Sequence, residues 1–189
     1  MDPDLLHHMT ARRHVSLRRL AEPGPDEAAL QSILAAAASA PDHGRMRPWR
    51  FILVPTHRRA DLGAAFVETL VARDPGCSEE ARAAACAKAY NAPCLLVAVL
   101  RDDPAADAIP RDEKLVSLGC AIQNMLVAAQ ARCFASGLAS GAGMGAPALR
   151  RLLGLEPHEQ ALCFIGFGSA EAGAPSRPRP GPDTFFSSL

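Results

Sequence analysis

Several residues that could bind a phosphate group gather near the N-terminus. Residues 12–16 read Arg-Arg-His-Val-Ser, and Arg18 and Arg19 follow closely. Guanidinium groups beside a hydroxyl can form charge-assisted hydrogen bonds to phosphate oxygens. Basic residues at the C-terminal end of a helix also interact favourably with the helix dipole in water. The segment alone therefore allows two interpretations, an anion site or a solvated basic turn.

A second group of candidate donors lies between a predicted helix and a predicted strand. His43, Arg45 and Arg47 are carried on a loop that also contains Pro41 and Pro48. Proline restrains its own backbone and that of the preceding residue, here Arg47. Loops at the ends of helices and strands often carry binding residues. The pattern favours a binding loop and a plain connector about equally.

Residues 136–145 contain four glycines, which would let backbone N–H groups approach a flat or anionic ligand. Their spacing is not the G-x-G-x-x-G of a dinucleotide site, and the segment lacks the Lys-Ser or Lys-Thr of a P-loop. The sequence also lacks G-x-S-x-G, H-E-x-x-H and a prominent pair of carboxylates. It therefore predicts neither a hydrolase triad nor a catalytic metal centre.

The elements that must position these segments alternate between helix and strand. Apolar periodicity predicts helices over residues 4–13, 25–40, 57–72, 78–91, 111–132 and 146–153. Apolar runs predict strands over residues 49–54, 94–100, 134–138 and 162–168. Residues 94–100 are continuously apolar, as strands covered on both faces are. The order of elements predicts an α+β or α/β arrangement in three layers.

The long helix over residues 111–132 is apolar along much of its length. Gln123 and Asn124 are polar within it. Polar side chains in such a helix usually have a hydrogen-bond partner. We therefore expect at least one of the two to have a buried partner.

Composition narrows the class of protein. The chain has 189 residues, 49% apolar and 21% charged, which is enough for one domain without disulfide bonds. Lys+Arg and Asp+Glu both total 20, and this balance argues against a nucleic-acid-binding protein. No apolar run reaches the roughly 18 residues of a membrane span, and no signal peptide is visible. Six cysteines without a C-x-x-C pair predict reduced thiols in a cytosolic protein and no cysteine-bound metal.

The composition changes at residue 173. The following residues, Gly-Ala-Pro-Ser-Arg-Pro-Arg-Pro-Gly-Pro, cannot form a helix or a central strand and are expected to be extended. Phe185 and Phe186 stand near the end, and two such aromatic side chains usually need a surface to lie on. We therefore divide the chain into a domain over residues 1–172 and an extended C-terminal arm over residues 173–189.

Taken in order, these motifs resemble the nitroreductase family of flavin enzymes. Arg-Arg-x-x-Ser at residues 12–16 is followed by Leu-Ala-Glu-Pro at 20–23, Ala-Pro-Asp-His at 40–43 and Arg-Pro-Trp at 47–49. Asn-Ala-Pro at 91–93, Gln-Asn-Met at 123–125 and the glycine-containing turn come next. The Ala-Pro-Asp-His and Pro-Trp elements are similar to a small bacterial NAD(P)H nitroreductase subgroup. The resemblance spans residues 5–186.

The resemblance implies an α+β fold, a three-layer α/β/α sandwich with a central mixed sheet and an extended C-terminal arm. It implies a homodimer with FMN at the subunit interface. NAD(P)H would reduce the flavin, and a nitroaromatic, quinone or similar acceptor would then take the electrons in a ping-pong hydride mechanism. The chemistry would take place on FMN, so no side chain is expected to act as a catalytic group.

The N-terminal segment matches the part of the family that binds the FMN phosphate and ribityl chain. The resemblance assigns this role to Arg12, Arg13 and His14. The family usually has Ser where this chain has His14, and Ser16 is the alternative source of that hydroxyl contact.

The remaining candidate residues match two other segments of the family. Ser39 and His43 would reach the flavin from the partner subunit. Arg47 stands where many members have Gln, near the pyrimidine edge, and a fixed charge there would stabilise the reduced flavin. The turn beside the flavin ring would consist of Leu138, Ala139 and Ser140, where the family often has Trp and a basic residue.

Two alternatives keep the fold and change the function. One is a non-catalytic protein that binds a flavin or nucleotide. The other is a flavin-consuming or dehalogenating relative, which needs a lid with specific polar groups. The alanine-rich stretch over residues 73–90 is the candidate lid and lacks such groups.

Overall fold

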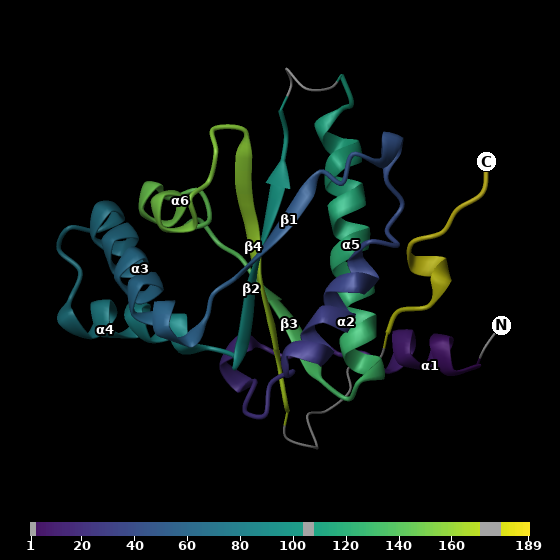
Figure 1. The fold of residues 1–189 in the computed structure, drawn as a ribbon, viewed down its shortest axis with the longest axis horizontal. Coiled ribbons are helices and arrows are strands. Elements are labelled where there is room, and N and C mark those ends of the chain that lie inside the picture. The colour runs from purple at the N-terminus through teal and green to yellow at the C-terminus, as the bar shows by residue number, and fades with distance from the viewer. Residues whose placement is uncertain (1–2, 104–107, 171–178) are drawn as a thin grey trace.

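The computed structural model describes residues 3–103, 108–170 and 179–189 and shows a sheet between two layers of helices (Figure 1). The helices are α1 (Pro3–Ala11), α2 (Glu27–Ala37), α3 (Arg59–Arg73), α4 (Glu79–Ala87), α5 (Arg111–Ala131) and α6 (Pro147–Leu153). The strands are β1 (Trp49–Leu53), β2 (Cys94–Arg101), β3 (Ala135–Ala139) and β4 (Glu159–Gly168). Short 3-10 helices are η1 (Leu17–Arg19), η2 (His43–Arg45), η3 (Thr56–Arg58), η4 (Lys88–Tyr90) and η5 (Pro182–Thr184).

The alternating side chains of β2 join two separate cores. Leu96, Ala98 and Leu100 pack with α2 and α5, whereas Val97 and Val99 pack with α3 and α6. Both faces of the strand are therefore buried, as its continuously apolar sequence predicted. Figure 1 shows α2 and α5 on one side of the sheet and α3, α4 and α6 on the other. The predicted three-layer α+β architecture is confirmed.

The strand directions differ from the predicted mixed sheet. The strand order is β1-β2-β4-β3, and each of these three pairs is antiparallel. A parallel bridge joins His14 to Ser136 at the β3 edge. Burial on both faces is common to parallel and antiparallel strands in three-layer folds, so apolar runs do not reveal direction.

Most predicted elements are present, and their ends differ for identifiable reasons. Residues 12 and 13 lie outside α1, because the chain turns there to pair Val15 with Ser136. β4 begins at Glu159, three residues before the predicted start, because the carboxylate of this buried residue is paired with Arg50. The predicted helix over 78–91 is α4 followed by η4.

Arg59, at the start of α3, is a buried cation bonded to backbone oxygens. Its guanidinium donates to the carbonyl oxygens of Ala89 (2.8 Å), Asn91 (3.4 Å), Ala92 (3.3 Å) and Pro93 (3.3 Å). Only 4% of the residue is exposed, and this burial lowers the pKa of Arg59. The contacts hold the turn before β2 against the helical layer that contains α3.

Ion pairs hold the other end of β2. Glu159 is 4% exposed and accepts two hydrogen bonds of 2.6 Å from Arg50 and one of 3.4 Å from Arg101. The hydrogen bonds from Arg50 lower the pKa of Glu159 to about 2. Close by, the fully buried Lys114 donates to Asp102 at 2.9 Å. The two ends of β2 are therefore held by different chemistry.

All six cysteines are free, in agreement with the predicted reduced thiols. Within the described residues, no helix has the length and apolar character to cross a membrane. The predicted boundary between residues 172 and 173 lies outside the described residues. The described part of the arm contains η5 and the exposed Phe185 and Phe186.

Candidate functional site

The N-terminal candidate segment lies along the edge strand β3. The backbone N–H of Val15 donates to the carbonyl of Ser136 at 2.9 Å, and Leu138 N–H donates to His14 Nδ1 at 3.4 Å. A Cβ on Gly137 would lie 1.9 Å from the Val15 oxygen, so glycine is required for this approach. The structure therefore brings two of the predicted segments together.

Arg12 and Arg179 form a pair of neighbouring cations in this cluster. The Arg179 guanidinium, on the C-terminal arm, donates to the backbone carbonyl of Arg12. Burial, and next the charge of Arg179, lower the pKa of Arg12. The Arg12 Nε is buried and has no acceptor among the described residues. A buried guanidinium donor without an acceptor, beside a second positive charge, is a favourable place for an anion.

The other N-terminal candidates are more exposed. Arg13 and Ser16 are exposed, and Ser16 makes no side-chain capping bond to η1. His14 uses Nδ1 toward the backbone of Leu138. Whether His14 or Ser16 supplies the phosphate-side contact therefore stays a prediction.

The turn after β3 presents both backbone and small side chains. Leu138 and Ala139 end the strand half-buried, and Ser140 follows exposed. Past them, Met144 N–H donates to the Gly141 carbonyl at 3.0 Å and closes a compact turn. The turn therefore lies beside the N-terminal segment, within one continuous cluster that we call the β3 cluster: residues 12–16, 136–140 and Arg179.

A second cluster consists of the loop after α2 and the side of α5. Ser39 Oγ donates to the Ala36 carbonyl at 2.8 Å and accepts from Asn124 Nδ2 at 3.2 Å. His43 Nδ1 lies 2.8 Å from Glu113 Oε2. We call residues 39–47 the α2 loop.

Arg47 occupies an unusual backbone conformation in the α2 loop. Its φ is 48°, and Gly44 and Arg45 also have positive φ values of 64° and 59°. The Asp42 carboxylate accepts the Arg47 N–H at 2.6 Å and holds this conformation. The predicted restraint on Arg47 therefore comes from Asp42 as well as from Pro48, and the Arg47 side chain is exposed.

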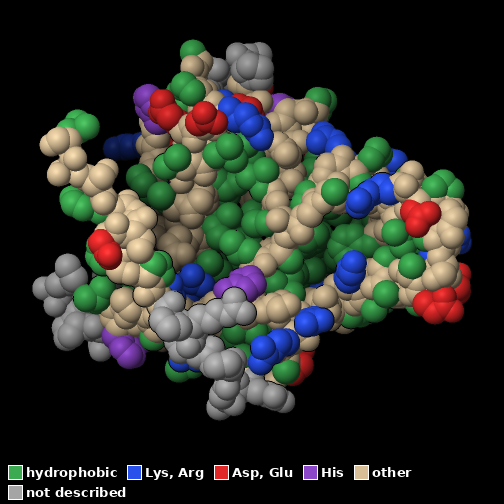
Figure 2. All heavy atoms as spheres, turned by 180° about the vertical axis from the view of Figure 1, so that it is seen from behind, with side chains coloured by type: hydrophobic (Ala, Val, Ile, Leu, Met, Phe, Trp, Pro, Cys, Tyr) green, Lys and Arg blue, Asp and Glu red, His purple; other side chains and the backbone are tan. Residues whose placement is uncertain are grey.

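The two clusters lie in different parts of the chain's fold. Figure 1 shows the α2 loop beside the upper part of α5 and the chain around η1 below the sheet, near β3. Figure 2 shows hydrophobic side chains gathered in a central hollow of the rear face, with basic and histidine side chains at its lower rim. The ten candidate residues thus form two groups rather than one site.

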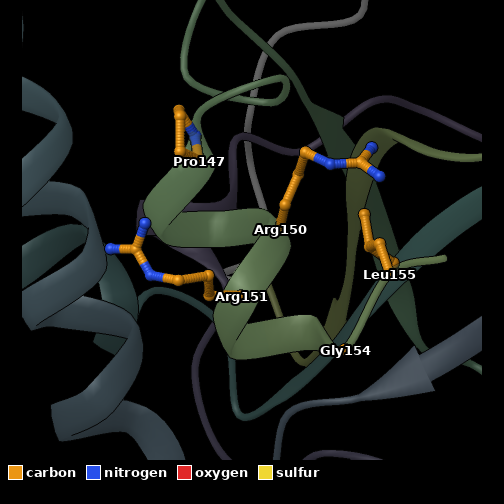
Figure 3. A pocket seen from close by; sticks show the side chains of 5 residues that line it. All are labelled: Pro147, Arg150, Arg151, Gly154 and Leu155. Atoms are coloured by element: carbon orange, nitrogen blue, oxygen red, sulfur yellow. The ribbon is translucent and has the colours of Figure 1, made fainter. Parts of the chain in front are cut away.

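One separate hollow among the described residues does not involve any candidate residue. It has a volume of about 460 Å³ and is lined by Pro147, Arg150, Arg151, Gly154 and Leu155 (Figure 3). The two guanidinium groups point to different sides: Arg150 donates to the Glu159 carbonyl at 2.6 Å, and Arg151 donates to Glu68 at 2.5 Å. Both are engaged in structural contacts. Across the described residues, no three His, Cys, Asp or Glu side chains are placed to hold a metal ion.

Two functional candidates were missed from the sequence. Arg179 belongs to an Arg-Pro-Arg run in the arm, which composition marked only as extended. Glu113 stood in the first turn of the long helix, where acidic residues are expected for helix stability alone. A search for basic residues in the arm could have found Arg179, whereas no local signal distinguishes Glu113.

Comparison with known proteins identifies the family. The model of the Nitroreductase family matches residues 11–169. The chain is 33% identical over 171 residues to a Haemophilus influenzae protein named "Putative NAD(P)H nitroreductase", covering 89% of this chain and 91% of that protein. It is 32% identical to "Putative NAD(P)H nitroreductase YdjA" of Escherichia coli strain K12, with 90% and 91% covered.

Solved structures share the fold. A nitroreductase-like family protein from Bacillus cereus superposes with a TM-score of 0.81 at 21% identity, over 98% of this chain and 95% of that one. A Bacteroides fragilis nitroreductase with bound FMN superposes with a TM-score of 0.72 at 21% identity, over 98% of both chains. From the match to the family and the identity to its members over most of its length, we conclude that the chain belongs to the nitroreductase family.

Proposed function

We propose that this protein is an FMN-dependent oxidoreductase that uses NAD(P)H to reduce nitroaromatic, quinone or similar acceptors in two alternating half-reactions. Family membership and the NAD(P)H nitroreductase names of its relatives support an NAD(P)H-dependent enzyme. The bound FMN of the Bacteroides fragilis neighbour supports the cofactor. FMN, when bound, supplies the hydride and electron chemistry.

The Arg12–Arg179 pair is the observation that carries the assignment of FMN. The buried Arg12 Nε lacks an acceptor among the described residues, and two guanidinium groups stand side by side. The dianionic FMN phosphate would supply acceptors and relieve this repulsion. Arg12, Arg13 and Arg179 would hold the phosphate, and His14 or Ser16 would supply a further contact on the phosphate side.

The other candidate residues would orient the ring. The backbone of Leu138 and Ala139 and the Ser140 side chain would lie beside it. Arg47 would place a permanent positive charge near the pyrimidine edge, which stabilises a negatively charged reduced ring in a low-dielectric site. No protein group needs to form a covalent bond to the substrate.

We propose that the protein is a homodimer with one FMN at each side of the interface. Ser39, His43 and Arg47 of one protomer would complete the site formed by the β3 cluster of the other, which accounts for two separate clusters in one chain. Phe185 and Phe186, 74% and 72% exposed, would be covered by the second copy, as would Val116 on α5. Sedimentation would show a dimer; a monomer that retains full FMN occupancy would reject this arrangement.

We further propose a cytosolic protein in which residues 1–172 form the flavin domain and residues 173–189 an arm that contributes to the dimer. Six free cysteines support a reducing compartment. The contact of Arg179 with the Arg12 carbonyl supports an arm that returns to the flavin domain.

The function is tested by spectra and rapid kinetics. Purified protein should show flavin absorbance, and mixing with NADH or NADPH without oxygen should bleach it within a turnover. Adding a quinone or nitroaromatic should restore the oxidised spectrum with no loss of FMN. Bound flavin that neither nucleotide reduces would indicate the non-catalytic binder, and FMN destroyed during turnover would indicate the flavin-consuming relative.

A further inference from the structure

Three side chains on one side of α5 bind three alternate residues of the α2 loop. Asn124 donates to Ser39 Oγ at 3.2 Å, Ser117 Oγ donates to the Pro41 carbonyl at 2.5 Å, and Glu113 lies 2.8 Å from His43. Positions four and seven apart share one side of a helix. The loop therefore runs antiparallel to α5 and is attached at three points, one turn and then two turns apart.

The conformation of the loop explains why it needs this support. Gly44, Arg45 and Arg47 all have positive φ, and non-glycine residues adopt this conformation at a cost in free energy. Asp42 fixes the far end through the Arg47 N–H. Such a conformation persists only when surrounding contacts hold it. The α5 contacts hold the near end, at Ser39, Pro41 and His43.

The same contacts determine which hydrogen-bonding groups remain for a ligand. The Ser39 hydroxyl gives its hydrogen to the Ala36 carbonyl and one lone pair to Asn124, so the other lone pair remains. A carboxylate oxygen at 2.8 Å from His43 Nδ1 favours, among the two neutral ring tautomers, the one with its hydrogen on Nδ1. The His43 Nε2 then carries a lone pair. Both side chains are left as acceptors.

We propose that Glu113, Ser117 and Asn124 are positioning residues that hold the α2 loop for FMN binding, and that Glu113 fixes His43 as an acceptor at Nε2. This inference rests on the proposed function, in which Ser39 and His43 reach the partner's FMN. The matching donors on FMN are its ring N–H and its ribityl hydroxyls. Glu113 itself would act through His43 without touching the cofactor.

The first experiment observes His43 directly and does not require FMN. Ring nitrogen shifts in ¹⁵N NMR spectra distinguish the two neutral tautomers, and the spectrum of His43→Ala assigns the signals. The wild-type protein should show the Nδ1–H tautomer. Glu113→Ala should shift His43 toward Nε2–H, whereas Glu113→Gln, which keeps an oxygen acceptor, should retain much of the wild-type signal. Asp112→Asn removes the same charge from the same helical turn and should change nothing.

The second experiment measures FMN affinity in a double-mutant cycle on the full chain. Loss of one positioning contact corresponds to about a three- to tenfold weaker Kd. Glu113→Ala should show this loss, Glu113→Gln should recover most of it, and Asp112→Asn should bind FMN like the wild type. In a His43→Ala background, Glu113→Ala should have no further effect, because the two residues act as one unit.

The possible results separate the inference from its premise. If Glu113→Ala raises the Kd for FMN equally in the wild-type and His43→Ala backgrounds, Glu113 does not act through His43. The inference is then overturned. If His43→Ala lowers the affinity for FMN and Glu113→Ala does not, the inference is again overturned while the proposed function stands. If His43→Ala leaves FMN affinity unchanged, the premise that His43 reaches FMN fails, and the positioning role for FMN falls with it.

Discussion

Replacing Arg12 by methionine tests the proposed phosphate site most directly. Arg12 is partly buried, its Nε has no acceptor among the described residues, and Arg179 stands beside it. Methionine keeps a long side chain and removes both the charge and the donors. Arg12→Met should therefore lose affinity for FMN while the folded chain stays intact.

The size of the effect follows from the contacts. A hydrogen bond to a charged partner contributes about 1.5–3 kcal/mol, which corresponds to roughly a tenfold to hundredfold change in Kd.

The stability of the FMN-free protein should change in the other direction. Because the pKa of Arg12 is lowered by burial and by the Arg179 charge, removing the Arg12 charge relieves a cost. The FMN-free variant should unfold at the wild-type temperature or slightly above it.

Two ligands and one control variant make the measurement specific. Fluorescence titration should show a large loss for FMN and a much smaller loss for riboflavin, which has no phosphate. Thermal unfolding should show that added FMN raises the Tm of Arg12→Met less than that of the wild type. Arg73→Met removes the same charge at the end of α3, on the other side of the sheet, and should bind FMN normally.

Equal losses for FMN and riboflavin would refute the reasoning, because the lost contact would then lie away from the phosphate. Wild-type affinity for FMN in Arg12→Met would refute it as well. A lower Tm of the FMN-free variant would show that the Arg12 charge stabilises the fold. Its Nε would then not be a donor kept for a ligand.

Three further outcomes follow from the structure. Arg47→Gln should make the flavin midpoint potential more negative, by about 30 mV for each 1.4 kcal/mol of lost stabilisation, with FMN occupancy nearly unchanged; coincident redox titrations would remove Arg47 from the site. Gly137→Ala would press a Cβ against the Val15 carbonyl and should lower both Tm and FMN affinity, whereas Gly119→Ala, with nothing within 4 Å, should do neither. Glu159 has a pKa of about 2 against an ordinary 4.5, so it stabilises the fold above pH 4.5 and loses this contribution as the pH falls toward 2, about 3 kcal/mol in all. Urea unfolding should show this loss in the wild type and a flatter pH dependence in Glu159→Gln.

The elements with strong apolar patterns were predictable. The helix expected over residues 111–132 is α5 over 111–131, and the strand expected over 94–100 is β2 over 94–101. The strand directions could not be predicted, and neither could the start of β4 at Glu159. A glutamate or a lysine is normally expected at the surface, and only the tertiary partners explain why Glu159 and Lys114 are buried.

The site was predictable in its segments and unpredictable in its contacts. The expected partner of Asn124 exists, although it is the exposed Ser39 rather than a buried group. Glu113 lies seventy residues from His43 in the sequence, and no local pattern reports such a distance. Arg179 lies in a proline-rich segment, and the prolines predict an extended backbone but give no indication of a binding residue.

The Arg59 contacts determine the end from which the paired strands β2 and β4 separate. Amide carbonyls do not titrate, so the four bonds that fasten the turn before β2 persist at every pH at which the guanidinium is charged. The opposite end, where Arg101 meets Glu159, depends on a carboxylate that acid neutralises. We therefore expect the β2–β4 pair to fray from Arg101 toward Cys94. Amide hydrogen exchange measured as the pH falls from 4.5 toward 2 would show protection lost first near Arg101 and last near Cys94.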